Sequence, residues 1–412
     1  MTIPHLSKTN NILFVSWEKI FLGIIFAFPI CDIITGFLIF RVGLPESFIG
    51  SPSQLIRIIF ILFGLSIIPY RKQRICVAVL LWILAIESLS LFYTPSFVPF
   101  ISGLNYGIKL LYIVLFYFGA EQYCAISHRA LFKFQSTIFN VALVYALGVI
   151  IPTILGFGEG SYGEGTFGQK GLLSSGNAIG IFLGIMNCLI ILKKKSKTEY
   201  LKQLIISISL IFLATKTALL LFLLGLILIL IKLKPAFRYL ILIFILAIIV
   251  IYMDIIYDVV RTVADVILFR FDNRESLFSF LMSSRDAYVS DAITEFMKSP
   301  IWILKFFIGG GAFMSFRSQY TNGMVFDTLE NEFFDIFFMY GIIGLVFYLG
   351  AIVYFFVKIE KKSSSLGFIF LLFCLHSILA GHILFDGIPI MSAVLIIQIA
   401  KYFTIECKEF NI

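Results

Sequence analysis

Apolar residues are grouped into long runs along nearly the whole chain, and short polar segments separate one run from the next. A helix needs about 20 apolar residues to cross a bilayer, and most runs approach that length. The runs lie at about 20–40, 54–70, 75–93, 104–120, 136–155, 176–192, 203–234 (which we divide into two), 239–257, 332–357, 365–383 and 388–404. The pattern predicts an all-α integral membrane protein with about twelve transmembrane helices.

One polar interval, residues 258–330, is much longer than the others. It divides the chain into predicted helices one to nine in 1–257, a large periplasmic loop at 258–330, and predicted helices ten to twelve in 331–412. The loop should contain short helices of its own. The first follows a cap-like spacing of Ser283 and Asp286 and is stopped by Pro300. Its apolar stripe consists of Val289, Ala292, Ile293 and Phe296.

Basic residues indicate the orientation of the predicted helices. Only 14% of residues are charged, against about 25% in an ordinary globular protein, and the mean hydropathy is +1.01. Lysines and arginines follow alternate runs, for example at 71–74, 193–195 and 358–362. The positive-inside rule predicts that these segments and both termini are cytoplasmic. We expect the membrane to be a bacterial inner membrane. The net charge of +8 then reflects topology, and no nucleic acid is expected as a partner.

The run at 203–234 is interpreted as a helical hairpin. Strongly basic segments flank it on both sides, so the chain must cross an even number of times if both segments are cytoplasmic. The tip is then residues 215–217. The arm 203–214 would be about 18 Å long, which is short of a hydrocarbon core of about 30 Å. Either the helix begins earlier, near Thr198, or Lys216 lies at or below the outer interface.

Several kinds of chemistry have no signature in the chain. The glycine-rich segment 156–171 contains GQKG but no GK followed by Ser or Thr, so it is not a P-loop. The six cysteines lie in apolar runs or in predicted cytoplasmic segments, and no CxxC pair or disulfide framework is present. No metal-binding motif is found, and neither a metal nor another cofactor is expected.

Ionisable residues inside the runs are candidates for function, because a charge within a bilayer is costly. Arg57, Lys109 and Lys216 would lie towards the periplasmic side, with Asp32 at a similar depth. Cations at that depth could bind an anionic lipid headgroup in the outer leaflet. The structural alternatives are snorkelling of the long side chains and an ion pair between Asp32 and Arg57.

Polar residues also gather where the large loop meets the tenth run. Asp327 and Glu330 have capping-box spacing, and Thr328 is an alternative cap. Glu330, Asn331 and Glu332 would then occupy the first helical turn, near the positive end of the helix dipole. Plain helix capping would also explain these residues.

Three more candidates lie in the large loop or near the end of the eleventh run. Arg285 would begin the loop helix, where a cation is unfavourable unless an anion is nearby. Arg317 is a further donor for phosphate or sugar. His382 is a candidate proton acceptor, although a hydrogen-bonded structural histidine is the more ordinary interpretation.

Four segments resemble motifs of the O-antigen polymerase and ligase family in their order and spacing. The resemblance implies glycosyl transfer at the periplasmic face between two undecaprenyl-pyrophosphate-linked glycans, with a chain-length regulator protein as a further partner. The segments are GTFGQKGLLSSGNAIG (165–180), TKTALL (215–220), SSRDAYVSDAITEFMKSP with IGGGAF (283–300 and 308–313) and DTLENEFFDIFFMYGIIGLVFYLG (327–350).

The resemblance also implies roles for residues. Arg285 and Lys216 would stabilise the leaving pyrophosphate, and Glu330 or Glu332 would take the proton of the acceptor hydroxyl. No metal or nucleotide is implied. The residues expected to contact pyrophosphate or glycan are Arg57, Lys109, Asn177, Arg317, Asn331 and His382.

Two alternatives stay open. Ligases of this family carry a His-Asn pair where this chain has Glu330 and Asn331, which favours a polymerase. Lys216 stands where the family has an arginine, so the charge is kept but the bidentate fork is lost. A transporter, such as a flippase for the same lipid-linked unit, would also have about twelve helices and buried cations. The long loop at 258–330 is the feature against a transporter.

Overall fold

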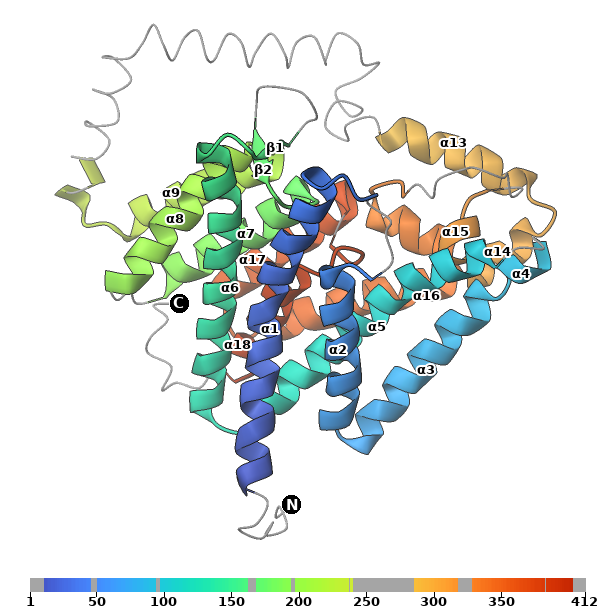
Figure 1. Cartoon of the computed structure of the whole chain (residues 1–412), viewed down its shortest axis with the longest axis horizontal. Coiled ribbons are helices and arrows are strands. Elements are labelled where there is room, and N and C mark those ends of the chain that lie inside the picture. The colour runs from blue at the N-terminus through green and yellow to red at the C-terminus, as the bar shows by residue number, and fades with distance from the viewer. Residues whose placement is uncertain are drawn as a thin grey trace, which may run out of the picture.

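Helices form where the apolar runs predict them. The computed structural model describes residues 11–45, 50–93, 97–161, 168–193, 197–236, 238–239, 285–317, 328–381 and 383–402. Eleven of the twelve predicted runs are occupied by helices, and the ninth, at 239–257, falls almost wholly outside these residues. The eleven helices are α1 (Asn11–Phe40), α2 (Pro52–Ile67), α3 (Tyr70–Glu87), α5 (Val98–Cys124), α6 (His128–Ile154), α7 (Gly176–Leu192), α8 (Lys197–Leu213), α9 (Lys216–Lys232), α16 (Glu332–Glu360), α17 (Ser364–Ala380) and α18 (Ile390–Lys401) (Figure 1).

Five helical stretches of the described chain are long and apolar enough to cross a membrane. Shorter apolar helices, including α2, α7 and α18, accompany them. The chain is therefore a mainly α-helical membrane protein, while the number of crossings stays a prediction. The five stretches are Trp17–Phe40, Tyr70–Phe92, Val98–Cys124, His128–Ile154 and Glu332–Glu360.

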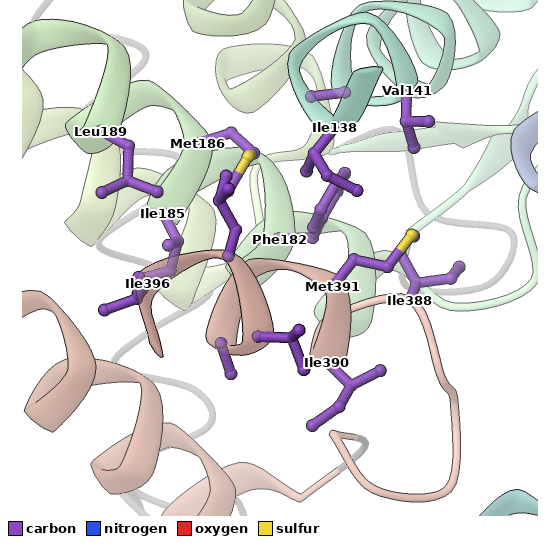
Figure 2. Packing of buried hydrophobic residues seen from close by; sticks show 14 of the residues in the cluster. Ile138, Val141, Phe182, Ile185, Met186, Leu189, Ile388, Ile390, Met391 and Ile396 are labelled. Carbon is purple, nitrogen blue, oxygen red and sulfur yellow. The ribbon is translucent and has the colours of Figure 1, made fainter. Parts of the chain in front are cut away.

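Helix α7 forms the core of the molecule. It contacts α6, α8, α9, α17 and α18, and all its side chains from Ala178 to Leu192 are buried. This stretch of α7 is apolar on all sides except at Asn187, as expected for a helix that other helices enclose. Figure 2 shows its side chains packed towards those of α6 and α18. The labelled residues are Ile138 and Val141 of α6, Phe182, Ile185, Met186 and Leu189 of α7, and Ile388, Ile390, Met391 and Ile396 at and before α18.

Glycines allow α7 and α9 to approach closely. A Cβ on Gly180 would lie 2.9 Å from the Thr215 hydroxyl oxygen, and one on Gly184 would lie 2.4 Å from the Leu221 side chain. Small residues at a four-residue spacing are typical of tightly packed membrane helices.

Two helices, α8 and α9, occupy the run at 203–234, as the predicted hairpin requires, while its crossing of the membrane stays a prediction. Helix α8 begins at Lys197, so the first of the two alternatives for its length is correct. Its 17 residues correspond to about 26 Å of helix. The ammonium of Lys232 donates to the carbonyls of Ile191 and Leu192, each at 2.9 Å, so the basic ends of α7 and α9 lie together.

Two ion pairs join three other helix ends. Glu121 of α5 accepts hydrogen bonds from Lys72 of α3 at 2.5 Å and from Lys401 of α18. These three ends therefore lie on one side of the molecule, as the basic segments predict. That this side is cytoplasmic stays a prediction.

The glycine-rich segment carries a short hairpin of strands β1 (Glu159–Gly160) and β2 (Gln169–Gly171), which pair antiparallel. Arg41, just after α1, forms an ion pair with Glu159 at 3.3 Å. Gly171 has φ +65°, and a Cβ there would lie 2.2 Å from the Gly148 carbonyl oxygen, so β2 rests directly on α6. The hairpin lies at the upper end in Figure 1, opposite the start of α1.

The large loop contains short helices, as predicted: α13 (Arg285–Lys298), α14 (Trp302–Ile308) and α15 (Gly311–Met314). A further four-residue helix, α4 (Ser90–Tyr93), lies between α3 and α5. Val289, Ala292 and Phe296 of α13 are buried, in agreement with the predicted stripe. Ile293 is exposed, so its assignment to the stripe is wrong. The buried face is narrower than the pattern suggests, because α13 packs against a single cluster of phenylalanines near α16.

Helix α16 is broken at Gly341, which has φ +66° and ψ −171°. The turn after α14 fits into this break, and the N–H of Gly310 donates to the carbonyl of Phe338 at 3.0 Å. A Cβ on Gly341 would lie 2.3 Å from the carbonyl oxygen of Phe307. Only glycine adopts this backbone conformation readily, so both the conformation and the close contact require it.

Candidate functional site

The turn between α17 and α18, residues 381–389, is the point at which several predicted site residues meet. Glu332, the first residue of α16, is fully buried and reaches into this turn. Its Oε1 accepts the backbone N–H groups of Ile383 and Leu384, each at 2.5 Å, and its Oε2 accepts the hydroxyl of Ser377. Three hydrogen bonds from the chain hold this carboxylate in one orientation. Glu332 therefore fixes the turn to the start of α16.

The chain before α16 packs against the same turn. A Cβ on Gly381 would lie 2.7 Å from the carbonyl carbon of Glu330, and the side chain of Glu330 is exposed. Asp335 accepts the backbone N–H groups of Leu329 and Asn331 at 2.9 and 3.2 Å. The junction is thus shaped by carboxylates that bind backbone donors, and it leaves the Glu330 side chain at the surface.

Helix α16 begins later than the capping-box spacing predicts. Its cap is Asn331, whose side-chain oxygen accepts the N–H of Phe334 at 3.4 Å. Thr328 is therefore not the cap, and Asp327 lies outside the described residues. The prediction fails because Asp335 draws the preceding backbone into a turn, so only the last of the three expected first-turn residues is helical.

The other side of the turn meets α2 and α5. Asp386 lies close enough to Arg57 of α2 and Lys109 of α5 to interact electrostatically with both. A Cβ on Gly387 would lie 3.5 Å from Nε of Arg57 and 3.3 Å from the ring of Tyr112. One short turn thus brings two predicted cations to the same region as the α16 junction.

Arg57 is held by the ion pair with Asp32 that the sequence suggests. The guanidinium lies 3.2 Å from the carboxylate of Asp32 and also bonds the hydroxyl of Ser53. The carboxylate in addition accepts Ser53 at 2.6 Å and the Tyr145 hydroxyl at 2.5 Å. Arg57 is therefore fixed in direction, and much of its charge is compensated.

The positive charge of Lys109 is compensated much less than that of Arg57. It is half-buried, and its ammonium lies 4.3 Å from the centre of the Tyr106 ring, which is a cation–π contact. Within the described parts of the chain it has no hydrogen bond or ion pair, and Asp386 is the acidic group that acts on it. This makes Lys109 the cation best placed to meet an anionic ligand.

Lys216 is connected to this region through α17. It is the first residue of α9, whose cap is Thr215. The hydroxyl of Thr217 lies 3.0 Å from Nδ1 of His376 in α17. The next residue of α17, Ser377, donates to the carboxylate at the start of α16. Consecutive residues of α17 therefore link the hairpin tip to the α16 junction.

A groove of about 530 Å³ runs along the surface between α9 and α17, with Lys216 at one end. Lys216 gives it one charged end, and the remainder is apolar. Its lining residues are Lys216, Leu219, Leu220, Leu223, Leu224, Ile227, Phe368 and Leu372.

Backbone strain occurs at the hairpin tip before α9 and at the junction before α16. In the part of the chain that the structure describes, the non-glycine residues with positive φ are Ala214 (+50°) and Glu330 (+54°). Ala214 precedes Thr215, the cap of α9, and Glu330 precedes Asn331, the cap of α16. Such conformations cost about 1–3 kcal/mol each and cluster at functional sites.

Two predicted substrate contacts lie elsewhere. Asn177 is half-buried in the first turn of α7, and a Cβ on the adjacent Gly176 would lie 3.4 Å from the Thr215 side chain. It is thus near the hairpin tip. Arg317 is buried, donates to the carbonyl of Phe313 at 2.8 Å and lies over that ring. Its guanidinium is engaged with the end of α15, and the structure does not bring it to the turn.

The remaining predicted residues lie outside what the structure describes. The backbone of Arg285 begins α13, but its side chain is not among the described ones, and neither is His382. Over the residues that are described, no group of three or more His, Cys, Asp or Glu side chains could hold a metal ion.

Glu87 is a buried acid that the sequence reasoning missed. It lies in α3 with 1% of its surface exposed, and it accepts the N–H of Ala312 at 2.9 and 3.1 Å and the hydroxyl of Tyr340 at 3.5 Å. It therefore ties α15 to α3 and α16. The sequence could have indicated it, because Glu87 is an ionisable residue within the predicted apolar run at 75–93.

Comparison with known proteins gives no family. No protein-family model matches the chain, and no curated protein sequence matches it significantly. Function must therefore be inferred from the site itself, since a fold class alone does not imply a function.

Proposed function

We propose that the protein polymerises O-antigen or capsule repeat units carried on undecaprenyl pyrophosphate, by glycosyl transfer at the periplasmic face of a bacterial inner membrane. The observation that carries this proposal is the turn 381–389, around which Arg57, Lys109, Glu330 and Glu332 gather. Glycosyl transfer from a pyrophosphate needs cations for the leaving group and a group that takes a proton.

The cations supply the first requirement. Lys109 is weakly compensated, and Arg57 is held in place by Asp32, so both are preorganised beside the turn. Preorganised charges stabilise a developing anion without having to rearrange during the reaction. Lys216, at the end of the groove between α9 and α17, would bind the same lipid-linked anion from the membrane side. Arg285 stays a further predicted member of this group.

In the proposed reaction, the acceptor sugar's hydroxyl oxygen attacks the anomeric carbon of the donor. The bond from that carbon to the pyrophosphate oxygen breaks, and the pyrophosphate leaves with the electron pair. The proton of the hydroxyl passes to a carboxylate. Glu330 suits this step better than Glu332, because its side chain is exposed while both oxygens of Glu332 accept hydrogen bonds from the chain.

One observation favours a transporter as a second candidate. Helix α16 is broken at Gly341, and discontinuous helices commonly form the substrate sites of transporters. A flippase would carry the same lipid-linked unit across the membrane without forming a glycosidic bond.

The test is to delete the gene in its host and examine the surface polysaccharide on a gel. The deletion strain is complemented with wild type, with Lys109→Met, and with Lys358→Met as a matched control. Lys358 is exposed near the far end of α16, where it bonds the Tyr354 hydroxyl. Removal of one preorganised charge typically costs about 10²–10³-fold in rate, so Lys109→Met should lose the long chains and Lys358→Met should keep them.

The pattern in the deletion strain separates the three activities. A ladder that collapses to the core with one repeat unit supports a polymerase. If even the single unit is lost, lipid-linked glycan that accumulates at the periplasmic face indicates a ligase, and accumulation at the cytoplasmic face indicates a flippase. A full ladder from Lys109→Met at wild-type protein level would remove Lys109 from the site.

A further inference from the structure

Helix α14 buries its charged residue and exposes its apolar ones, which is the reverse of an amphipathic helix in water. Its one charged residue, Lys305, is 2% exposed and donates to the carbonyls of Arg317 at 2.7 Å and Met314 at 3.2 Å. Its large apolar side chains face outwards instead. The exposed residues are Trp302, Ile303, Leu304, Phe306 and Phe307.

The preceding helix has a mixed surface. The exposed face of α13 carries Asp291, Thr294 and the ion pair of Lys298 with Glu295, together with the side chains of Tyr288, Ile293 and Met297. Charged residues are therefore present on the exposed surface of α13 and absent from that of α14, and the change lies at the turn that joins the two helices. Such a sharp change is expected where a chain passes from water into lipid.

The neighbours of α14 continue the same apolar surface. Helix α14 packs against α16 at the break, and beyond the break α16 exposes the apolar side chains of Ile343, Val346 and Phe347. Helix α15, which follows α14, contacts α4 and α5. There Phe92 is 83% exposed and Phe97, just before α5, is 67% exposed. Figure 1 shows α4, α14 and α15 at the same edge of the molecule.

We propose that these side chains form a patch that is inserted among the lipid chains of the bilayer, so that α14 enters the membrane without crossing it. The α14 patch consists of Trp302, Ile303, Leu304, Phe306, Phe307, Phe92 and Phe97.

Lipid is the occupant that fits the patch. The patch lies beside the exposed apolar side of α16, a helix long and apolar enough to span a membrane, and large exposed apolar surfaces mark sites that contact a membrane or another protein. A cation on the outer face of α14 would be costly in lipid, and Lys305 is instead turned to backbone carbonyls, which satisfy it within the protein. The inference concerns α14 itself and does not depend on the proposed polymerase activity.

Tryptophan fluorescence can test the position of α14 directly. The chain has three tryptophans, so Trp17→Phe with Trp82→Phe leaves Trp302 as the only one. The purified protein is placed in phosphatidylcholine vesicles whose acyl chains carry bromine. Trp302 should lose about half of its emission to bromine on the upper acyl carbons, because interfacial helices lie about 5–10 Å below the headgroup boundary. Aqueous iodide should quench it little.

The control moves the tryptophan to α13. Tyr288→Trp in a chain without the three natural tryptophans places the probe on the exposed face of α13, and iodide should quench it while brominated lipid does not. Quenching of Trp302 by iodide to the same extent would overturn the proposal. Protection of Trp302 from both quenchers would also overturn it, because a protein surface would then cover the patch.

The unmodified chain provides a second measurement that no folding defect can disturb. A membrane-partitioning aryl diazirine should label the peptide that contains Phe306 and Phe307, and a water-soluble carbodiimide should modify Asp291 of α13. Absence of diazirine label from the α14 peptide, with label present on α16, would refute insertion.

Discussion

Replacing Glu332 with glutamine and with alanine separates the two roles that this residue could have, an anchor for the turn 381–389 or a proton acceptor. In glutamine, the oxygen can still accept both backbone N–H groups that Oε1 accepts now. The amide nitrogen would donate to the Ser377 oxygen, and the Ser377 hydroxyl would turn to Tyr348, whose oxygen lies 2.6 Å away. Every hydrogen bond of the anchor therefore has a counterpart in Glu332→Gln.

Alanine keeps none of these bonds. Glu332→Ala would leave the backbone N–H groups of residues 383 and 384 buried without an acceptor, at about 1–3 kcal/mol each, or about 2–6 kcal/mol together. Glutamine loses only the charge-assisted part of the interactions, which we place at about 1 kcal/mol. The two variants should thus differ by several kcal/mol although they change the same side chain.

The assay measures unfolding and function side by side. Membrane proteins often unfold irreversibly, so the apparent melting temperature of the purified protein in detergent is compared at one fixed scan rate. Glu332→Gln should melt near wild type and support a full polysaccharide ladder, and Glu332→Ala should melt well below both. If glutamine destabilises as much as alanine, the hydrogen bonds assigned to the turn are wrong. If Glu332→Gln is stable but gives no ladder, the charge of Glu332 takes part in the reaction and the anchoring role is insufficient.

Three further predictions concern stability and use the same melting assay. Gly341→Ala should lower the free energy of unfolding by at least about 2 kcal/mol, because its backbone conformation suits glycine alone and the new Cβ would meet a carbonyl of α14. The control Gly350→Ala, on the same helix with no atom within 4 Å, should be neutral or stabilise by up to about 1 kcal/mol. Equal losses in the two variants would contradict this role of Gly341. Asp32→Asn should cost about 3 kcal/mol, because it leaves Arg57 as a largely buried charge without its partner, and an unchanged melting temperature would show that the pair is not needed. Burial lowers the pKa of Lys305 to about 8, so between pH 8 and about 10.5 the unfolded chain binds more protons than the folded one. The melting temperature should therefore rise with pH over that range. Lys305→Met should not show the rise, and a rise in that variant would refute Lys305 as its origin.

Much of the helical plan follows from the sequence, because each membrane helix satisfies its own backbone and needs only a local run of apolar residues. The hairpin is the clearest case. Its two arms follow from the basic segments on either side, and the structure places Lys232 against the carbonyls at the end of α7. The extension of α8 back to Lys197 was one of the two alternatives that the length of the arm allowed.

The site was predicted only in part, because its contacts join residues that lie far apart along the chain. The pair of Asp32 and Arg57 could be foreseen from depth alone, since both lie in the outer halves of predicted helices. The binding of Glu332 to the turn 381–389 could not be foreseen, because every residue except proline has a backbone N–H and the sequence does not show which ones will bind a carboxylate. The spacing of Asp327 and Glu330 pointed to the wrong helix start for a related reason, since it ignored how Asp335 bends the preceding backbone.

The enclosure of α7 has a consequence for how the protein is made. During synthesis α7 leaves the ribosome before α8, α9, α17 and α18, all of which surround it in the finished molecule. Until those helices arrive, lipid must cover the surfaces that they later occupy, including Asn187, which finally accepts the Ser207 hydroxyl at 3.3 Å. Helices α17 and α18, which are made after the others that contact α7, therefore complete its enclosure. A nascent chain that stops before α17 would present this unfinished surface to the proteases that survey the membrane.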